Sequence, residues 1–320
     1  MPEGDAVHRL AAAFERLFVG SECHCWSPQG RFAHGAALLS GRTMAAATAH
    51  GKHLFLAFDD AAGERLWLHV HLGLYGAWRF HSAAPVEDLP HAIGAPRSSG
   101  VVDVAREHLA LSFIDEAGAG GPGTPAAEWI PPAPIGQVRL RIEAPGIVAD
   151  LTGPNQCEVL DDGERVGVLS RLGPDPLAPG AAEDAVACEH FVGSVRQRKR
   201  VIAELVMDQS IVAGVGNIYR AEGLYLCRIN PHRRGNRVSE KRLRQLWAEF
   251  CRLMARGLQI GRIVTVNPED APAEPIPGDE EASRFYVYHR TGRPCLRCGT
   301  PIAEETLQGR RNFWCPNCQR

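Results

Sequence analysis

Residues 295–318 read CLRCGTPIAEETLQGRRNFWCPNC, and this stretch decides the fold of the C-terminal end. Two Cys-x-x-Cys pairs frame it, sixteen residues apart: Cys295, Cys298, Cys315 and Cys318. Four thiolates on two facing turns satisfy the tetrahedral preference of Zn²⁺ and leave no open position. A segment of about 40 residues has too small a core to fold without such a staple. The sequence therefore predicts a zinc ribbon with one structural zinc ion; a redox-active cysteine pair is the alternative.

The stretch between the two cysteine pairs carries two adjacent arginines. Residues 308–314 (QGRRNFW) predict a hairpin whose tip presents Arg310 and Arg311. Guanidinium groups bind phosphate oxygens in a fork geometry, and the neighbouring aromatic residues suit contacts with bases. This pattern indicates a nucleic-acid contact, although two solvated arginines without a partner would give the same pattern.

Upstream, residues 207–220 read MDQSIVAGVGNIYR and predict the end of one helix and the start of another at Asn217. Glycines let backbone N–H groups approach a ligand closely, and a helix N-terminus is an anion site. No P-loop or dinucleotide fingerprint accompanies these glycines, so the phosphates of a nucleic acid are favoured over a nucleotide. A Gly-x-Gly that only makes a tight turn is the alternative.

The net charge of −2 hides a strong asymmetry along the chain. Residues 193–262 hold fifteen Lys or Arg against five Asp or Glu, a balance of +10. Residues 284–320 hold seven against two, while 263–283 carry six acids and no base. A basic C-terminal half is the expected footprint of a phosphate-binding surface, although solvated charged helices are the alternative.

The first half of the chain changes from helical to strand periodicity. Apolar residues recur at helical spacing from Val7 to Phe18, so a helix begins within a few residues of the N-terminus. Strand patterns follow, at 52–58, 65–71, 138–142 and 156–160. They predict an antiparallel β-sandwich with a leading helix. From about residue 181 helical stripes return, one of them with Ser239 as its N-cap.

Six stretches together resemble the formamidopyrimidine-DNA glycosylase and endonuclease VIII family from end to end. They are Met1-Pro2-Glu3-Gly4, Gly51-Lys52-His53-Leu54, Leu74-Tyr75-Gly76, Arg171-Leu172-Gly173-Pro174-Asp175, residues 208–219 and the zinc ribbon. The resemblance implies a bifunctional base-excision-repair enzyme that removes an oxidised base from damaged DNA and then cuts the strand by β,δ-elimination.

Four catalytic residues follow from the resemblance. Pro2, exposed once Met1 is removed, is the implied nucleophile whose secondary amine attacks C1′ and forms a Schiff base. Glu3 is the implied acid/base that helps to open the sugar, and Lys52 the second acid/base for base loss and β-elimination. Arg310 is implied to neutralise a phosphate beside the lesion and to support δ-elimination. Without Pro2 and Glu3, the favoured interpretation of Lys52 would be a charge that protects a sheet edge from pairing with another chain.

The resemblance also implies the residues that bind DNA. Asn217 and Arg171 are expected to hold backbone phosphates around the flipped nucleotide, together with Gly216 and Ile218 at the helix start. Leu74 and Tyr75 are expected to wedge into the gap left in the base stack, where unstacking costs a few kcal/mol. Core positions are the alternative for both wedge residues.

The motifs indicate the class of damaged base less specifically than they indicate the family. Leu74-Tyr75-Gly76 and Pro2-Glu3-Gly4 favour the endonuclease VIII branch, and hence oxidised pyrimidines. Gly73 departs from the pattern, because a polar side chain is expected there for contact with the opposite base. An oxidised-purine glycosylase (8-oxoguanine or formamidopyrimidine) and a non-catalytic zinc-ribbon protein that binds nucleic acid are the competing hypotheses.

The fold class expected is therefore an α+β multidomain chain. The expected divisions are a catalytic β-sandwich domain at 1–150, a linker at 151–180, a helix–two-turn–helix DNA-binding domain at 181–265, an acidic Pro-rich linker at 266–283 and a zinc finger at 284–320. Residues 117–134 are predicted to be an inserted Gly/Pro-rich surface loop. No apolar run reaches the ~20 residues of a membrane span. We expect a monomer in the bacterial cytoplasm, associated with the nucleoid, with zinc as its one cofactor and with reduced thiols.

Overall fold

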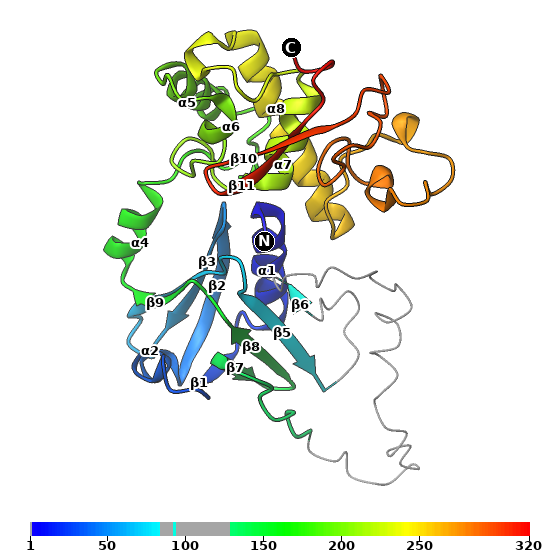
Figure 1. The fold of residues 1–320 in the computed structure, drawn as a ribbon. Coiled ribbons are helices and arrows are strands. Elements are labelled where there is room, and N and C mark those ends of the chain that lie inside the picture. The colour runs from blue at the N-terminus through cyan, green and yellow to red at the C-terminus, as the bar shows by residue number, and fades with distance from the viewer. Residues whose placement is uncertain (1, 84–91, 94–128) are drawn as a thin grey trace.

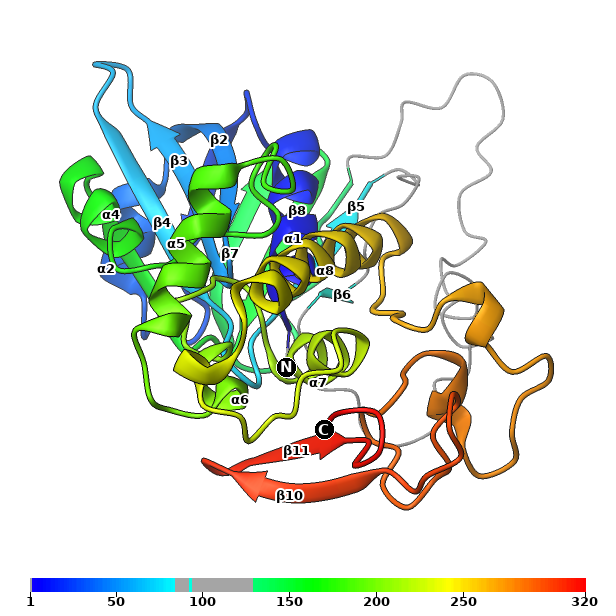
Figure 2. The same cartoon turned by 90° about the horizontal axis from the view of Figure 1, so that it is seen from above.

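The computed structural model describes residues 2–83, 92–93 and 129–320 of the chain. A β domain with a leading helix lies on one side of the molecule and a helical domain on the other (Figure 1). A short C-terminal hairpin lies beside the helical domain, as the view in Figure 2 also shows. Residues 117–128 of the expected inserted loop lie outside the described residues.

The β domain is a continuous series of antiparallel strands that folds into two layers. Its strands are β1 (Glu22–Trp26), β2 (Arg42–His50), β3 (His53–Asp59), β4 (Arg65–His71), β5 (Ala77–Ser82), β6 (Ala92–Ile93), β7 (Val138–Ala144), β8 (Ile147–Thr152) and β9 (Gln156–Leu160). The order is β6-β5-β8-β7-β1-β2-β3-β4-β9. One end of β1 pairs with β2 and the other with β7, so the two sheets meet at β1 and enclose a shared core. The predicted sandwich is confirmed.

Helix α1 (Gly4–Leu17) packs into this core through one apolar face, as its periodicity predicted. Phe14 carries much of the contact, since its ring centroid lies 4.8 Å from that of Trp78 and 5.2 Å from that of Phe80. Helix α2 (Ala33–Leu39) covers β1. Because α1 begins at Gly4, its first residues emerge at the junction with the helical domain, where Gly4 N donates to Gly214 O.

The stretch 151–180 contains more structure than a linker. Strand β9 pairs with β4 over five residues, and helix α4 (Asp162–Leu169) follows it with a capping box at Asp161. The sheet therefore extends beyond residue 150, and we place the end of the β domain after β9. The connection proper then runs over α4 to the start of α5.

The helical domain consists of α5 (Ala185–Arg196), α6 (Ile202–Leu205), α7 (Asn217–Leu226) and α8 (Glu240–Ile260), with a 3-10 turn at Gly235–Arg237. Ser239 caps α8 by accepting from Arg242 N, as expected from the sequence. The core contains Phe191 against Trp247 and Phe250. None of the helices in the described ranges is both long and apolar enough to cross a bilayer.

The C-terminal part begins with two 3-10 turns, Pro268–Asp270 and Glu280–Ser283. Near its end it contains a hairpin of the strands β10 (Ala303–Leu307) and β11 (Arg310–Trp314). Its core includes two residues of α7, Ala221 and Tyr225. The acidic stretch 266–283 is tied into this part, because buried Asp279 pairs with buried Arg290 at 2.8 Å. The expected α+β multidomain architecture is present.

Candidate active site

The carboxylate of Glu3 sits on the N-terminus of α7. It accepts hydrogen bonds from the backbone N–H groups of Gly216 (2.9 Å), Ile218 (2.8 Å) and Tyr219 (3.3 Å). A Cβ on Gly216 would lie 2.5 Å from Glu3 Cδ, so only glycine leaves room for this approach. The sequence predicted an anion site here and assigned Gly216 and Ile218 to DNA. In the structure the anion held by these N–H groups is the chain's own Glu3.

Burial shifts the pKa of this carboxyl group. Glu3 is 2% exposed, and its burial raises the pKa above the ordinary value, while the charge of Lys52 and the three N–H groups oppose that rise. Asp5 on the first turn of α1 has a pKa raised to about 6 by burial and by the charge of Glu3. A carboxyl group with a raised pKa is suited to donate a proton near neutral pH.

Lys52 reaches the same place from the β domain. It lies in the turn between β2 and β3, is 7% exposed, and its Nζ donates to Val215 O at 2.7 Å. Burial lowers its pKa to about 8, the charge of Glu3 opposes this, and the charge of Arg310 adds to it. Because a lysine with a pKa near 8 exchanges its proton readily, Lys52 is suited to acid/base chemistry. The structure does not place it at a sheet edge.

A small pocket joins Lys52 to the N-terminus. Its lining residues are Pro2, Val7, Lys52, His71, Leu72 and Gly73. Pro2 and Lys52 therefore face one cavity, with Glu3 next to Pro2 in the chain. The sequence-predicted trio meets although Lys52 is 50 residues from Pro2 in the sequence.

Asp175 holds the lysine turn against the helical domain. Its Oδ2 accepts from Gly51 N at 2.6 Å and lies 2.8 Å from His8 Nε2. His50, at the other side of the turn, has its Nε2 2.9 Å from Gly173 O. These contacts fix the position of Lys52 relative to α7, and the Arg-Leu-Gly-Pro-Asp stretch supplies them.

The two expected wedge residues are exposed. Leu74 is 53% and Tyr75 71% exposed in the turn between β4 and β5. They are thus outside the core, and their apolar surface is available to a partner. The preceding Gly73 has φ +66°, and a Cβ there would lie 2.8 Å from the Cβ of exposed Asn155. The missing polar side chain at position 73 therefore has a steric reason.

Replacing Gly73 by glutamine is expected to destabilise the protein rather than to supply the polar group. A left-handed φ costs a non-glycine residue about 1–2 kcal/mol, and the contact with Asn155 adds to this. Gly63 is a matched control, because its φ is +84° and an added Cβ would meet nothing within 4 Å. Thermal unfolding should show a larger loss for Gly73→Gln than for Gly63→Gln; equal losses would contradict the steric explanation.

A histidine cluster beside the pocket was not singled out from the sequence. His53 Nδ1 lies 2.8 Å from His69 Nε2, and His69 Nδ1 lies 2.8 Å from Glu158 Oε1. His71 lies across from His53 in the β3–β4 register, with 5.0 Å between ring centroids. Burial and neighbouring positive groups lower the pKa of His53 to about 3 and that of His71 to about 4. These rings are therefore neutral near pH 7.

The cluster should make the protein sensitive to acid. A histidine whose folded pKa lies below its unfolded value of about 6.5 stabilises the fold above pH 6.5, and this contribution is lost as pH falls towards the folded pKa, which is about 3 for His53. Across that window His53 should account for about 2–4 kcal/mol of unfolding free energy. Denaturation at stepwise pH should show a shallower acid slope for His53→Gln than for the wild type. His24→Gln, at an exposed position of β1, should retain the wild-type slope; equal slopes for all three proteins would refute the assignment.

The C-terminal hairpin is held on α7 and carries Arg310. Arg310 is exposed at the start of β11, next to the turn, and its charge contributes to the lowered pKa of Lys52. Asn217 Nδ2 donates to Arg311 O at 3.0 Å, and Arg220 Nη2 donates to the same oxygen at 2.8 Å. Asn217 thus holds the hairpin in this structure, and the Arg311 side chain is paired with Glu304 rather than free.

Arg171 is exposed just after α4. Burial lowers the pKa of His69, and the charge of Arg171 adds to this. Leu74, Tyr75, Arg171 and Arg310 are exposed around the junction, whereas Pro2, Glu3 and Lys52 lie within it.

The four predicted zinc ligands converge. The Sγ atoms of Cys295, Cys298, Cys315 and Cys318 all lie within 4.8 Å of one another. Tyr225 OH lies 3.2 Å from Cys295 Sγ, a polar contact of the kind that orients a metal ligand. Four thiolates so arranged fit a closed tetrahedral zinc site, which holds structure and performs no chemistry.

Three family models match the chain. They are the formamidopyrimidine-DNA glycosylase N-terminal domain at residues 1–118, the formamidopyrimidine-DNA glycosylase H2TH domain at 172–268, and the zinc finger found in FPG and IleRS at 292–320. A curated relative, Endonuclease 8 1 of Mycobacterium tuberculosis, is 38% identical over 321 residues and covers 100% of both chains. The formamidopyrimidine-DNA glycosylase of Nocardia farcinica is 30% identical, over 89% of this chain and 83% of its own length.

A solved structure extends the agreement to the whole fold. Lactococcus lactis formamidopyrimidine-DNA glycosylase, bound non-covalently to DNA containing an abasic site, aligns with a TM-score of 0.68, 19% identity and 99% coverage of each chain. The class of protein is accordingly a DNA glycosylase of base excision repair that is also an abasic-site lyase. Within that class, the chain belongs to the formamidopyrimidine-DNA glycosylase and endonuclease VIII family.

Proposed function

We propose that this glycosylase acts through the secondary amine of Pro2. After removal of Met1 the amine attacks C1′ of the damaged nucleotide, the base leaves, and an iminium links enzyme and sugar. An α-amino group has a pKa of about 8, against about 10.4 for lysine, so a useful fraction is unprotonated near neutrality. The observation that carries the proposal is the junction where Pro2 and Lys52 line one pocket and Glu3 is held on the N-terminus of α7.

Four further side chains and Glu3 take the remaining steps of acid/base catalysis and phosphate binding. Glu3, whose pKa burial raises, protonates and opens the sugar. Lys52, with a pKa of about 8, assists base loss and β-elimination. Arg310 neutralises a phosphate beside the lesion and supports δ-elimination. Arg171 and Asn217 bind flanking phosphates; Asn217 exchanges its bond to Arg311 O for one to DNA.

We assign oxidised pyrimidines as the preferred lesions. Leu74 and Tyr75, exposed beside the pocket, fill the gap left by the flipped nucleotide. Base–aromatic stacking contributes roughly 1–3 kcal/mol per base, so Tyr75 replaces part of the lost stacking energy. The exposed amide of Asn155 offers beside them the polar group that Gly73 lacks. The similarity to a relative named Endonuclease 8 1 favours this lesion class.

The proposal extends to the oligomeric state, the cofactor and the location of the enzyme in the cell. The enzyme binds damaged DNA as a monomer and carries one zinc ion in its four-cysteine site, with no other cofactor. It works in the bacterial cytoplasm at the nucleoid.

The proposal is tested by trapping with borohydride. The purified protein, its N-terminal mass measured, is mixed with duplexes carrying thymine glycol, 8-oxoguanine or an abasic site. A covalent adduct on the N-terminal peptide, formed faster with thymine glycol than with 8-oxoguanine, is the expected result. No adduct on any duplex would overturn the Pro2 mechanism, whereas faster trapping on 8-oxoguanine would overturn only the pyrimidine assignment.

A further inference from the structure

Helix α7, whose N-terminus binds Glu3, carries a buried carboxylate of its own that the proposed reaction does not use. Glu222 is fully buried six residues after Gly216, on the helix whose N-terminus holds Glu3. It accepts from the consecutive N–H groups of Tyr286 (2.8 Å), Val287 (2.9 Å) and Tyr288 (2.9 Å). The Thr265 hydroxyl donates to it as well. Four donors from two separate segments therefore converge on one side chain.

Stability alone gives no reason for this arrangement. Removing a carboxylate from water is costly, and burial raises the pKa of Glu222 while its four donors oppose the rise. Apolar side chains of similar size often hold two segments together equally well. A cradle of successive N–H groups around one anion, in contrast, defines the position of a segment in all directions. The geometry therefore specifies where residues 286–288 lie on α7.

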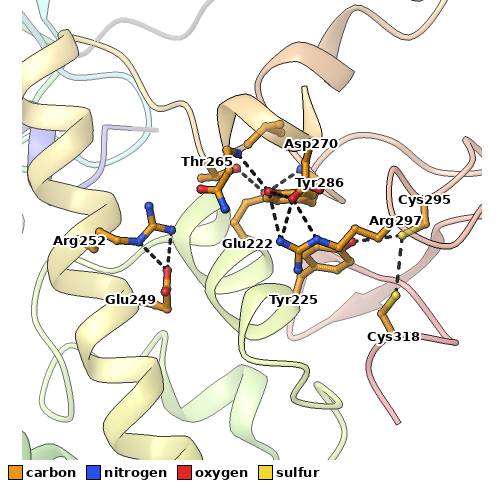
Figure 3. Close-up of polar contacts among 12 residues, drawn as sticks. Glu222, Tyr225, Glu249, Arg252, Thr265, Asp270, Tyr286, Cys295, Arg297 and Cys318 are labelled. Carbon is orange, nitrogen blue, oxygen red and sulfur yellow. Dashed lines mark hydrogen bonds and ion pairs between the residues drawn. The ribbon is translucent and has the colours of Figure 1, made fainter. Parts of the chain in front are cut away.

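Residues 286–288 lead directly into the zinc ribbon. Figure 3 shows Glu222 beside Tyr286 and Thr265, with Asp270, Arg297 and Tyr225 around them. The Tyr225 ring stacks on Tyr286 at 4.8 Å, and its hydroxyl meets Cys295 Sγ. Arg297, between the cysteines, lies over both rings and pairs with Asp270 at 2.8 Å. One face of α7 thus holds the base of the ribbon from the Glu222 cradle to a zinc ligand.

The ribbon in turn carries Arg310. Near the hairpin, its attachment to α7 runs through Arg311 O, which accepts from Asn217 and Arg220. When the Asn217 side chain turns to the proposed phosphate contact, the bond from Arg220 and the Glu222 cradle still attach the ribbon to α7. The distance from Arg310 to Glu3 then depends on α7, which is attached to both.

We propose that Glu222 is a positioning residue of the strand-cleavage reaction: by holding residues 286–288 on α7 it sets the place of Arg310 relative to Lys52. This inference rests on the proposed function, because it assigns a role to Arg310. In this proposal α7 positions both the acid Glu3, at its N-terminus, and the phosphate-binding Arg310 of the ribbon.

The test compares Glu222→Gln with Arg310→Ala and with the double variant, each as full-length zinc-loaded protein. A glutamine keeps the size but turns an amide donor towards backbone N–H groups. The measurements are the ratio of δ- to β-elimination products, the borohydride adduct on an abasic duplex, and zinc content by mass spectrometry. Glu249→Gln is the matched control, because Glu249 pairs with Arg252 on the surface of α8 (Figure 3).

Glu222→Gln is expected to lower the δ/β ratio about tenfold, as loss of a charged hydrogen bond in a cradle warrants. It should retain zinc and should still form the adduct, and in the Arg310→Ala background it should lower the ratio no further. Glu249→Gln should match the wild type. An unchanged ratio, or an additive effect in the double variant, would overturn the inference.

Two further results keep the test decisive. If Glu222→Gln does not fold, Thr265→Val removes only the hydroxyl donor, and a smaller shift of the ratio in the same direction is expected; an unchanged ratio overturns the inference. Failure of the proposed function is seen separately, because the wild-type protein would then form no adduct.

Discussion

Replacing Glu3 by glutamine is expected to reduce base excision by roughly 10²–10⁴-fold, the usual contribution of a positioned general acid. The glutamine oxygen can still accept from an N–H group of α7, so the helix start should keep its place. The amide, however, has no proton to give to the sugar. Single-turnover excision with saturating enzyme measures the loss directly, and the unfolding temperature reports whether the site has been disturbed.

The pH dependence separates chemistry from folding in this experiment. Because the acid acts in its protonated form and burial raises the pKa of Glu3, wild-type rates should fall as pH rises through that pKa. Glu3→Gln should lose this limb of the profile. Glu22→Gln, an exposed acid at the start of β1, should keep both rate and profile. Wild-type rates in Glu3→Gln at every pH would exclude Glu3 as the acid.

Local patterns predicted those parts of the molecule that depend on neighbours in the sequence. The zinc ligands follow from two short cysteine pairs, and α1 and α8 follow from apolar periodicity. The helix start at Asn217 was expected to bind phosphate, and in the structure its N–H groups bind the Glu3 carboxyl group. This occupant was not predicted, because Glu3 lies more than 200 residues away in the chain. A helix N-terminus shows that an anion belongs there but does not say which molecule provides it.

The spacing of the histidines along the strands could have predicted the histidine cluster. His69 and His71 are two residues apart on a strand and therefore share one face, and a hairpin register brings His53 opposite. Glu222 had no such signal. An acid in a helix is normally read as the solvated face, and only the chain that follows 60 residues later covers it. Tertiary packing decides the meaning of such a residue, so it could not be read from local sequence.

Loss of one zinc ligand should be nearly as damaging as loss of the acid. Cys298→Ala removes one of four thiolates, and structural zinc sites supply ~10–16 kcal/mol of apparent binding energy to folds of this size. The ribbon core is small and shares Ala221 and Tyr225 with α7, so without zinc the hairpin should detach and Arg310 should move away from Lys52. We expect zinc content below half an equivalent and strand cleavage reduced about 100-fold or more, since both phosphate binding and δ-elimination depend on the ribbon.

The same variant should leave the other two domains folded, because Leu307 is the one residue of the ribbon that packs against their cores among the residues that the structure describes. A second, unchanged unfolding transition in calorimetry would show this. Cys188→Ala, at a half-buried cysteine of α5 remote from the four ligands, is the matched control and should keep both zinc and cleavage. Full cleavage by a zinc-free Cys298→Ala protein would show that Arg310 acts without a folded ribbon, and the coupling through α7 would then have no role.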